Sequence, residues 1–196
     1  LGPVAQALNL GRGDRMEYLV SLSSDQFGMT AYAEKKFGKD SEEAKREYKM
    51  GDMNTSVIRT AKGKSIMIQH DVTSPRPYNR KHALSGTKGY IEKYPRPGIA
   101  LDPSDELSVN FENLSAHGFL PEKQFDEMMK NYEHPITREV GEMAKKVGGH
   151  GGMDFIMDYR LIYCLRNGLP LDINVYDGVE WSCLLYTSDA ADDLIG

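Results

Sequence analysis

The feature that most constrains the fold is a pair of strand-like runs, at residues 55–60 and 64–71, joined by a short connection that contains Gly63. Glycine in such a connection is a hairpin signal, because it accepts the positive φ that tight turns require. Further strand-like runs lie at residues 17–23, 82–87, 90–94 and 99–101. Since hairpins join neighbouring strands antiparallel, we expect a largely antiparallel sheet.

The second half of the chain predicts helices. Phe125, Met128, Met129 and Tyr132 are spaced at i, i+3, i+4 and i+7, which places them on one helical face. Residues 153–166 carry apolar side chains on more than one face, so we expect this helix to be mostly buried. Other helices are expected at residues 3–9 and 30–37, and from about residues 40, 121, 135 and 175. Strands followed by helices favour an α+β fold, with an open sheet and helices packed on one face.

Composition narrows the classes of function. The chain has 196 residues and a net charge of −5 without a long single-sign block, which disfavours a nucleic-acid or anionic-membrane surface. No apolar run approaches the roughly 18 residues of a membrane span. The five histidines show no zinc-ligand spacing and the two cysteines make no disulfide framework, so we expect no metal site. The cellular compartment stays open, because the chain begins at Leu1 without a methionine.

A proline-rich segment follows the hairpin, at residues 69–80 (QHDVTSPRPYNR). Each proline fixes its own φ and biases the preceding residue toward an extended conformation, so the segment leaves the strand as a stiff chain. It carries Arg76, Tyr78 and Arg80, whose guanidinium and phenol groups bind hydroxyls, carboxylates or phosphates. A solvated polar loop would have the same composition, so both interpretations remain open here.

A glycine-rich segment, residues 148–154 (GGHGGMD), precedes the helix expected at residue 153. Four glycines around His150 would let backbone N–H groups approach a ligand at the positive end of that helix. A flexible connection with an exposed histidine is the alternative. The segment is no dinucleotide-binding fingerprint, because it follows a helix rather than a strand.

Two further features have a functional and a structural interpretation. Arg12-Gly13-Asp14 is the tripeptide of some adhesion ligands, and a chance match within a turn is the alternative. Trp181 is able to stack on a sugar, and the alternative is a tryptophan of the core or of an interface.

Four long motifs together resemble glycoside hydrolase family 109: GDMNTS from residue 51, QHDVTSPRPYNR from 69, GGHGGMDF from 148 and CLRNGLPLD from 164. This family comprises NAD-dependent α-N-acetylgalactosaminidases and is a branch of the glucose–fructose oxidoreductase and inositol dehydrogenase superfamily. The resemblance runs in order through residues 1–182. It implies the C-terminal α+β domain of a two-domain enzyme, whose N-terminal Rossmann domain binds NAD and is absent from this sequence.

The resemblance also implies a mechanism. The family is understood to remove terminal α-N-acetylgalactosamine by oxidation, elimination, addition of water and reduction, a route that needs no pair of catalytic carboxylates. The catalytic residues are expected upstream of Leu1, so the prediction for this chain contains none, and the chain is expected to be inactive alone. Tyr78 matches the family tyrosine that is expected to contact the sugar. Arg76, Arg80 and His150 are expected to shape or orient the site.

Two departures from the family pattern accompany the resemblance. His70 stands where relatives are expected to carry a bulkier aromatic residue, so the subsite there is expected to differ. Residues 183–196 resemble a translated sequencing adapter, so we expect a domain at 1–182 followed by an unrelated tail. Cys164 is then the only native cysteine and is expected to be buried.

Two alternatives to the glycosidase hypothesis remain. The first is an NAD(P)-dependent sugar oxidoreductase of the same superfamily. The second is a non-catalytic fragment that forms a homo-oligomer through the outer face of its sheet, as members of the superfamily often do.

Overall fold

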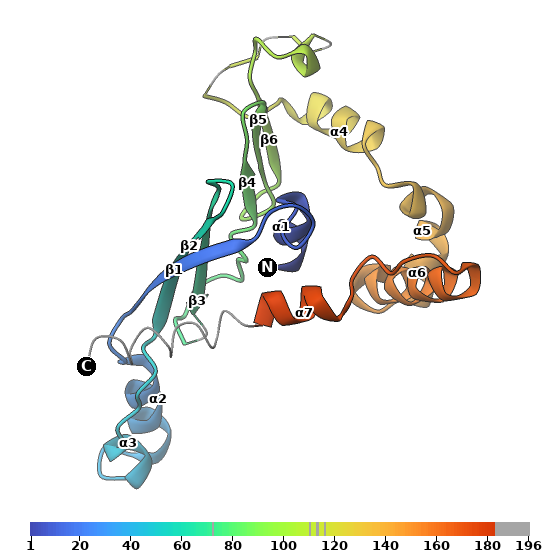
Figure 1. The fold of residues 1–196 in the computed structure, drawn as a ribbon. Helices are drawn as coiled ribbons and strands as arrows, with labels where there is room; N and C mark the ends of the chain where they lie inside the picture. Colours follow the sequence, from blue (N-terminus) through green and yellow to red (C-terminus); the bar gives the residue numbers. More distant parts are fainter. Residues whose placement is uncertain (72, 110, 113, 116, 183–196) are drawn as a thin grey trace. The chain divides into compact units, whose positions relative to one another are not determined.

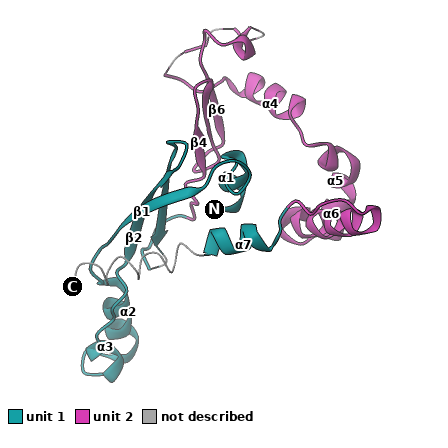
Figure 2. Ribbon diagram, viewed as in Figure 1, with its two compact units in different colours: residues 1–77, 173–196 teal, residues 78–172 magenta. Residues whose placement is uncertain are grey.

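A computed structural model describes residues 1–182 of the chain, apart from residues 72, 110, 113 and 116. The chain divides into two compact units, of which the first comprises Leu1–Pro77 and Ile173–Gly196 and the second Tyr78–Asp172 (Figure 2). Each unit is described by itself. The tail that the sequence predicts at residues 183–196 lies outside the described residues.

The first unit is built on the predicted hairpin. Strands β1 (Met16–Ser23), β2 (Met53–Thr60) and β3 (Ser65–Asp71) form an antiparallel sheet in the order β1-β2-β3 (Figure 1). The turn between β2 and β3 contains Gly63 at a φ of 83°, which confirms the predicted role of this glycine. The register of the strands alternates side chains between the two faces of the sheet.

One face of this sheet is the core of the first unit. Ile58 and Ile66 are paired across β2 and β3, and they are buried together with Ala5 of helix α1 (Gly2–Ala7). Burial of such a side chain contributes about 1.5–3 kcal/mol. Trp181 of helix α7 (Val175–Ser182) packs against the same cluster, so the structural interpretation of this tryptophan is confirmed.

The opposite face of the sheet exposes a row of apolar side chains. Val20, Val57 and Met67 are direct partners across the three strands and are 67%, 47% and 63% exposed. Leu22 and Tyr18 on β1 lie two residues to either side of Val20 and are also exposed. We call these five residues the open sheet face. Strands with one covered and one solvated face ordinarily present polar residues to water, so this row is an unusual surface for a monomer.

A buried carboxylate joins the turn after α1 to the hairpin. Asp14 accepts hydrogen bonds from the hydroxyl of Thr60 at 2.9 Å and from the backbone N–H of Lys62 at 3.1 Å, and it pairs with the ammonium of Lys64 at 3.2 Å. Burial alone would raise the pKa of Asp14, but these donors and the N–H of Arg15 outweigh it and hold the pKa at about 2.

The adhesion-type tripeptide is therefore part of the fold. Asp14 is buried. Arg12 binds both carboxylate oxygens of Asp177 in α7, at 2.7 and 2.8 Å. The hydrogen bond from Arg12 lowers the pKa of Asp177. Neither charged side chain is presented to an adhesion receptor, so the chance-match interpretation holds.

An insertion between β1 and β2 forms helices α2 (Gly28–Phe37) and α3 (Glu42–Lys45). Both helices agree with the sequence prediction. Asp52 accepts hydrogen bonds from the backbone N–H groups of Phe27 and Gly28, and so caps the start of α2 from outside the helix. Ser41 caps α3 by accepting from the N–H of Ala44.

The second unit contains a smaller sheet. Strands β4 (Ala83–Ser85), β5 (Gly89–Glu92) and β6 (Gly98–Leu101) are antiparallel in this order. The strands predicted at 82–87 and 90–94 are shorter than expected, since a turn at Gly86 ends β4 and β5 ends at Glu92, before Pro95. After the short helix η1 (Glu106–Ser108), helix α4 (Glu122–Asn131) packs Met128 against Ile99 and Leu120.

The remaining helices of the second unit are α5 (Pro135–Val147), the short η2 (His150–Gly152) and α6 (Met153–Asn167). The prediction that α6 is mostly buried is wrong. Cys164 is buried as expected, at 1% exposure, but Met157, Ile162 and Leu165 are 61%, 53% and 65% exposed. Within the second unit α6 contacts α5 and η2, which cover one stripe of the helix and leave its other apolar residues in solvent.

The predicted α+β class with antiparallel strands is confirmed. The strands fall into two sheets of three where the sequence suggested a single sheet, because the proline-rich segment after β3 interrupts the succession of hairpins. In the part of the chain that the structure describes, no helix is long and apolar enough to cross a membrane.

The Asp14 network makes a prediction about stability and pH. The pKa of Asp14 is about 2 in the folded chain and has an ordinary value of 3.8, so its ionised form stabilises the fold above pH 3.8 and loses this effect as the pH falls toward 2. Asp14→Asn should therefore lower the melting temperature at pH 7, and the difference from the unsubstituted chain should shrink between pH 4 and pH 2.

Asp40→Asn is the matched control, because the Asp40 side chain is fully exposed and pairs only with Lys45 at 3.6 Å. It should leave the melting temperature unchanged at every pH. Thermal melts followed by circular dichroism measure both variants. An Asp14→Asn chain as stable as the unsubstituted one at pH 7 contradicts the role of the network.

Candidate functional site

The glycine-rich connection between α5 and α6 adopts a conformation that few residues permit. All five residues from Gly148 to Gly152 have a positive φ, including His150 at 47°. A Cβ atom at Gly152 would lie 2.8 Å from the carbonyl carbon of Ala144, so the connection is packed tightly against the last turn of α5. The glycines are therefore required by the backbone, and His150 is the one side chain that this connection carries.

His150 forms a pair with a carboxylate of the following helix. Its Nδ1 lies 2.9 Å and 3.1 Å from the two carboxylate oxygens of Asp154, in the first turn of α6. A hydrogen bond from Nδ1–H to Asp154 fixes the tautomer, so Nε2 becomes the ring nitrogen that exchanges a proton with a ligand. The side chain of His150 is 76% exposed, which leaves Nε2 accessible. This geometry is that of an oriented general acid or base.

The sequence analysis did not identify Asp154 as a site residue. A signal for it existed, because His150 and Asp154 are four residues apart, a spacing that brings side chains together on a helical turn. The irregular connection hid this signal, since a glycine-rich run does not predict a helical relation between its histidine and the next helix.

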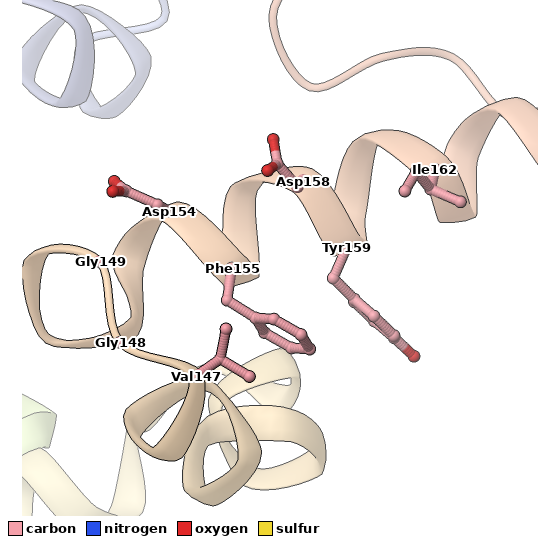
Figure 3. A pocket seen from close by; sticks show the side chains of 8 residues that line it. All are labelled: Val147, Gly148, Gly149, Asp154, Phe155, Asp158, Tyr159 and Ile162. Carbon is pink, nitrogen blue, oxygen red and sulfur yellow. The ribbon is translucent and has the colours of Figure 1, made fainter.

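A hollow of about 420 Å³ is lined by Asp154 of this pair but not by His150 (Figure 3). Its volume is within the usual range for small-molecule sites. The lining consists of Val147, Gly148, Gly149, Asp154, Phe155, Asp158, Tyr159 and Ile162. The rings of Phe155 and Tyr159 point to one side of α6 and the carboxylates of Asp154 and Asp158 to the other (Figure 3). The aromatic side suits the apolar C–H face of a sugar.

One wall of the hollow is held in place by a hydrogen bond. The hydroxyl of Tyr159 donates to Glu139 of α5 at 2.8 Å, and this bond raises the pKa of Tyr159. The ring of Tyr159 also stacks on that of Phe155, with centroids 6.2 Å apart. These contacts join the first two turns of α6 to α5 and stiffen the aromatic wall.

Tyr78 and Arg80 form a second candidate centre in the same unit. Tyr78 is 69% exposed, and its hydroxyl accepts a hydrogen bond from Nε of Arg80, which raises the pKa of Arg80. The ring of Tyr94 contacts that of Tyr78 edge-on, at 5.9 Å and 81°. Because Arg80 fills an acceptor position of the phenol oxygen, the phenol proton points elsewhere and is available to an oxygen of a ligand.

Arg76 has a structural partner in the first unit. Its Nε lies 3.2 Å from the buried carboxylate of Asp71, which accepts from the backbone N–H groups of Thr73 and Ser74. The N–H of Ser74 is the main cause of the lowered pKa of Asp71, which burial opposes and Arg76 reinforces. The contact of Arg76 is long for a hydrogen bond, and Oδ2 of Asp71 has no other polar partner. Arg76 thus fixes the start of the proline-rich segment.

The predicted site residues therefore fall into three places. Tyr78 contacts Arg80, and His150 contacts Asp154, but no hydrogen bond, ion pair or ring contact among the described residues joins the two pairs. Arg76 belongs to the first unit. Comparison with known proteins identifies the family to which the chain belongs.

The sequence profile of the glycosyl hydrolase 109 C-terminal domain matches residues 1–191. The chain belongs to glycosyl hydrolase family 109. It is 54% identical to the alpha-N-acetylgalactosaminidase of Bacteroides fragilis over 189 residues, which are 96% of this chain and 42% of that protein. It is 52% identical to glycosyl hydrolase family 109 protein 2 of Phocaeicola vulgatus over 189 residues, 96% of this chain and 43% of that protein.

A third relative is the glycosyl hydrolase family 109 protein of Porphyromonas gingivalis, 49% identical over 187 residues, 94% of this chain and 39% of that protein. The chain thus spans about two fifths of the length of the curated relatives it matches. The resemblance seen in the sequence is confirmed for the family and for its C-terminal domain.

Enzymes of family 109 use NAD, a dinucleotide whose pyrophosphate is ordinarily bound by a parallel βαβ unit. Both sheets are antiparallel, and neither contains the parallel βαβ unit whose glycine-rich turn binds a pyrophosphate. The part of the chain with described coordinates therefore does not fit an NAD site on its own. Within that part, no group of three or more metal-ligating side chains comes together either.

The glycine connection makes a prediction about stability. Gly152→Ala should lower the free energy of unfolding by at least ~1–2 kcal/mol, because alanine is strained at a φ of 98° and its Cβ would overlap Ala144. Urea unfolding followed by circular dichroism measures the loss. Gly178→Ala is the control, since Gly178 lies within α7 with open space around it, and there alanine should stabilise by up to about 1 kcal/mol. Equal stability of the Gly152→Ala chain and the unsubstituted chain contradicts the close packing of the connection.

Proposed function

We propose that this chain is the substrate domain of an enzyme that releases terminal α-N-acetylgalactosamine from glycans in an NAD-dependent reaction. The observation that carries the proposal is the 54% identity, over 96% of the chain, to the alpha-N-acetylgalactosaminidase of Bacteroides fragilis. Because the chain spans 42% of that relative, the activity is proposed for the whole enzyme and not for these residues alone. The substrate domain is proposed to comprise residues 1–182, although the family match continues to residue 191.

His150 is proposed to move a proton at the glycosidic bond. Departure of an aglycone requires a proton on its leaving oxygen, and addition of water requires removal of one. The His150 side chain is exposed, and Asp154, which lines the hollow, holds the ring in one orientation through Nδ1. The sequence alone assigned no catalytic residue to this chain, because all such residues were expected upstream of Leu1. The role proposed for His150 departs from that expectation.

Tyr78 is proposed to donate a hydrogen bond from its phenol to an oxygen of the sugar. Arg80 orients the phenol from one side and Tyr94 supports the ring from its edge. Arg76 is proposed to act indirectly, by fixing the segment that precedes Tyr78 through its ion pair with Asp71. NAD, when bound elsewhere in the enzyme, supplies reversible hydride transfer, and no step is assigned to it here.

The test is a fusion of the N-terminal part of the Bacteroides fragilis relative to residues 1–182 of this chain. With a chromogenic α-N-acetylgalactosaminide, the fusion should release the aglycone without net formation of NADH. Net accumulation of NADH without release of the aglycone would instead support the alternative of a sugar oxidoreductase. A folded fusion that binds NAD and does neither refutes the proposed function.

Removal of the imidazole should slow the chemical step. In the fusion, His150→Ala should lower kcat by about 10²- to 10⁴-fold, which is the usual contribution of a general acid or base. His117→Ala is the control, because His117 is an exposed histidine of the same unit outside both candidate centres, and it should leave kcat unchanged. A His150→Ala enzyme with full activity removes His150 from the proposed mechanism.

Loss of the phenol proton donor should have a smaller effect. Tyr78→Phe should raise KM or lower kcat by about 2- to 13-fold, because a single hydrogen bond contributes about 0.5–1.5 kcal/mol. Tyr132→Phe, at the same 69% exposure but outside this centre, is the control and should behave like the unsubstituted enzyme. Kinetics of Tyr78→Phe that match those of the control contradict the contact between Tyr78 and the sugar.

The open sheet face is proposed to mediate a homo-oligomer. It presents five neighbouring apolar side chains on three strands, and a flat row of this kind fits the same row of a second copy related by a two-fold axis. A non-catalytic oligomerisation role is compatible with the same surface. The catalytic and the non-catalytic role differ in glycosidase activity, which the assay of the fusion enzyme measures.

Charge on the open sheet face should abolish assembly. Leu22→Glu and Met67→Glu should each convert an oligomer into a monomer in sedimentation velocity at micromolar concentration, because a buried unpaired carboxylate is costly. Met50→Glu is the control, since Met50 is 78% exposed but lies outside the strands. If the unsubstituted chain already sediments as a clean monomer, the proposed interface is wrong.

A further inference from the structure

A cationic surface surrounds the two tyrosines of the second centre. The antiparallel ladder of β4 and β5 continues past Ala83 and Glu92, because the backbone N–H of Lys93 donates to the carbonyl of His82 at 2.8 Å. This bond places residue 82 beside residue 93. The rings of Tyr78 and Tyr94 are also in contact.

Positive charge is concentrated in these two segments. Residues 78–82 and 93–96 contain Arg80, Lys81, Lys93 and Arg96 and no aspartate or glutamate, in a chain whose net charge is −5. All four cations are exposed. We call Arg80 and Lys93, with Tyr78 and Tyr94, the cationic tyrosine cluster.

Two of the cations are held against the rings instead of against carboxylates. The guanidinium of Arg80 lies 5.5 Å from the centroid of Tyr78, and the ammonium of Lys93 lies 5.9 Å from that of Tyr94. Among the residues with described coordinates, neither cation forms an ion pair with an acidic side chain. Cation–π contacts position a positive charge without neutralising it, so both remain able to bind an anion.

Another lysine of the same sheet shows the contrast. Lys88, in the turn before β5, pairs with Asp105 at 3.5 Å and with Glu106 at 3.1 Å. Its charge is compensated within the fold. Among the described residues, Arg80 and Lys93 are therefore set apart by the absence of an acidic partner and by their contacts with the rings of Tyr78 and Tyr94.

We propose that the cationic tyrosine cluster binds an anionic substituent, a sulfate ester or a carboxylate, on the sugar next to the terminal N-acetylgalactosamine. This inference rests on the proposed function and names the class of glycan on which the enzyme acts. Tyr78 is proposed to contact the terminal sugar, and the cations of Arg80 and Lys93 lie 5.5 and 5.9 Å from the centroids of Tyr78 and of Tyr94 beside it, so an anion on the neighbouring sugar is within their reach. A guanidinium matches the planar oxygens of either anion, and an ammonium adds a point charge.

The experiment compares three substrates with the fusion enzyme: the disaccharide α-N-acetylgalactosaminyl-galactose, its galactose 6-sulfate, and the analogue with galacturonic acid. We expect kcat/KM to be about 3- to 10-fold higher for at least one anionic substrate than for the neutral one, as for an exposed charge-assisted contact. The preference should vanish at about 0.5 M salt, which screens exposed charges. The sulfate and carboxylate arms distinguish the two anions.

Substitutions assign the effect to the cluster. Lys93→Gln should reduce the ratio of anionic to neutral kcat/KM toward one, and Lys93→Arg should restore it. Lys88→Gln is the matched control and should leave the ratio unchanged, because Lys88 is already paired with two carboxylates. Equal kcat/KM for all three substrates, or a ratio that Lys93→Gln does not change, overturns the inference.

A binding measurement separates this inference from the proposed function. The fusion is titrated with galactose 6-sulfate and with galactose while NMR follows the ring signals of Tyr78 and Tyr94. Shifts caused only by the sulfated sugar support the cluster even if no N-acetylgalactosaminide is cleaved, an outcome that would refute the proposed function alone. Equal responses to both sugars, or an equal response to a short DNA oligonucleotide, would overturn the cluster as a glycan site.

Discussion

Asp14 occupies the position on which the geometry of the first unit depends. Its carboxylate binds the end of β2 through Thr60, the turn through Lys62 and the start of β3 through Lys64, so one side chain holds the whole hairpin connection. A hairpin with a fixed turn has a fixed register, because a slip by one residue would exchange its two faces. The register in turn places Ile58 and Ile66 in the core, and it ends β3 at Asp71.

The consequences of this register reach the proline-rich segment. Asp71, at the end of β3, is buried and collects the backbone N–H groups of Thr73 and Ser74 together with the guanidinium of Arg76. A carboxylate with several donors restrains the residues that supply them. The prolines at 75 and 77 then limit the backbone that follows. The segment is thus stiff for two independent reasons, of which only the prolines were visible in the sequence.

The sequence predicted the parts of the fold that local chemistry determines. The hairpin with Gly63, the helix α4 and the start of α5 at Pro135 follow from periodicity, turn glycines and the fixed φ of proline, and all three are confirmed. The predicted apolar face of α4 is buried in part, since Met128 is buried but Met129 and Tyr132 are 51% and 69% exposed. The division into two sheets could not be predicted in this way. Pairing between distant strands depends on contacts that a single sequence does not reveal.

Helix α6 shows a second limit of prediction. Its apolar composition suggested burial, yet burial is a property of the surroundings, and among the described elements of the second unit α5 and η2 make the main contacts with this helix. Apolar side chains on several faces of a helix predict that other segments of protein pack against those faces. They do not predict that the partners belong to the same 196 residues, and the chain spans about two fifths of the relatives it matches.

The candidate site was predicted in part, for a similar reason. Tyr78, Arg80 and His150 were expected from the resemblance to a family and from the motifs that carry it, whereas the contact between Tyr78 and Arg80 came from the geometry. Asp154 was not expected, although it is four residues from His150, because a glycine-rich run with positive φ angles from Gly148 to Gly152 does not predict a helical relation between the two.

The contacts of charged side chains separate those that serve the fold from those that face a ligand. Arg12, Asp14 and Arg76 each have an opposite charge as partner within the first unit. Arg80 and Lys93 lie instead on aromatic rings, which fix a cation and leave its charge uncompensated. His150 is oriented by Asp154 on one nitrogen and exposed on the other. Polar groups that are oriented on one side and open on the other are what binding and proton transfer require, because orientation reduces the entropy lost when a ligand arrives.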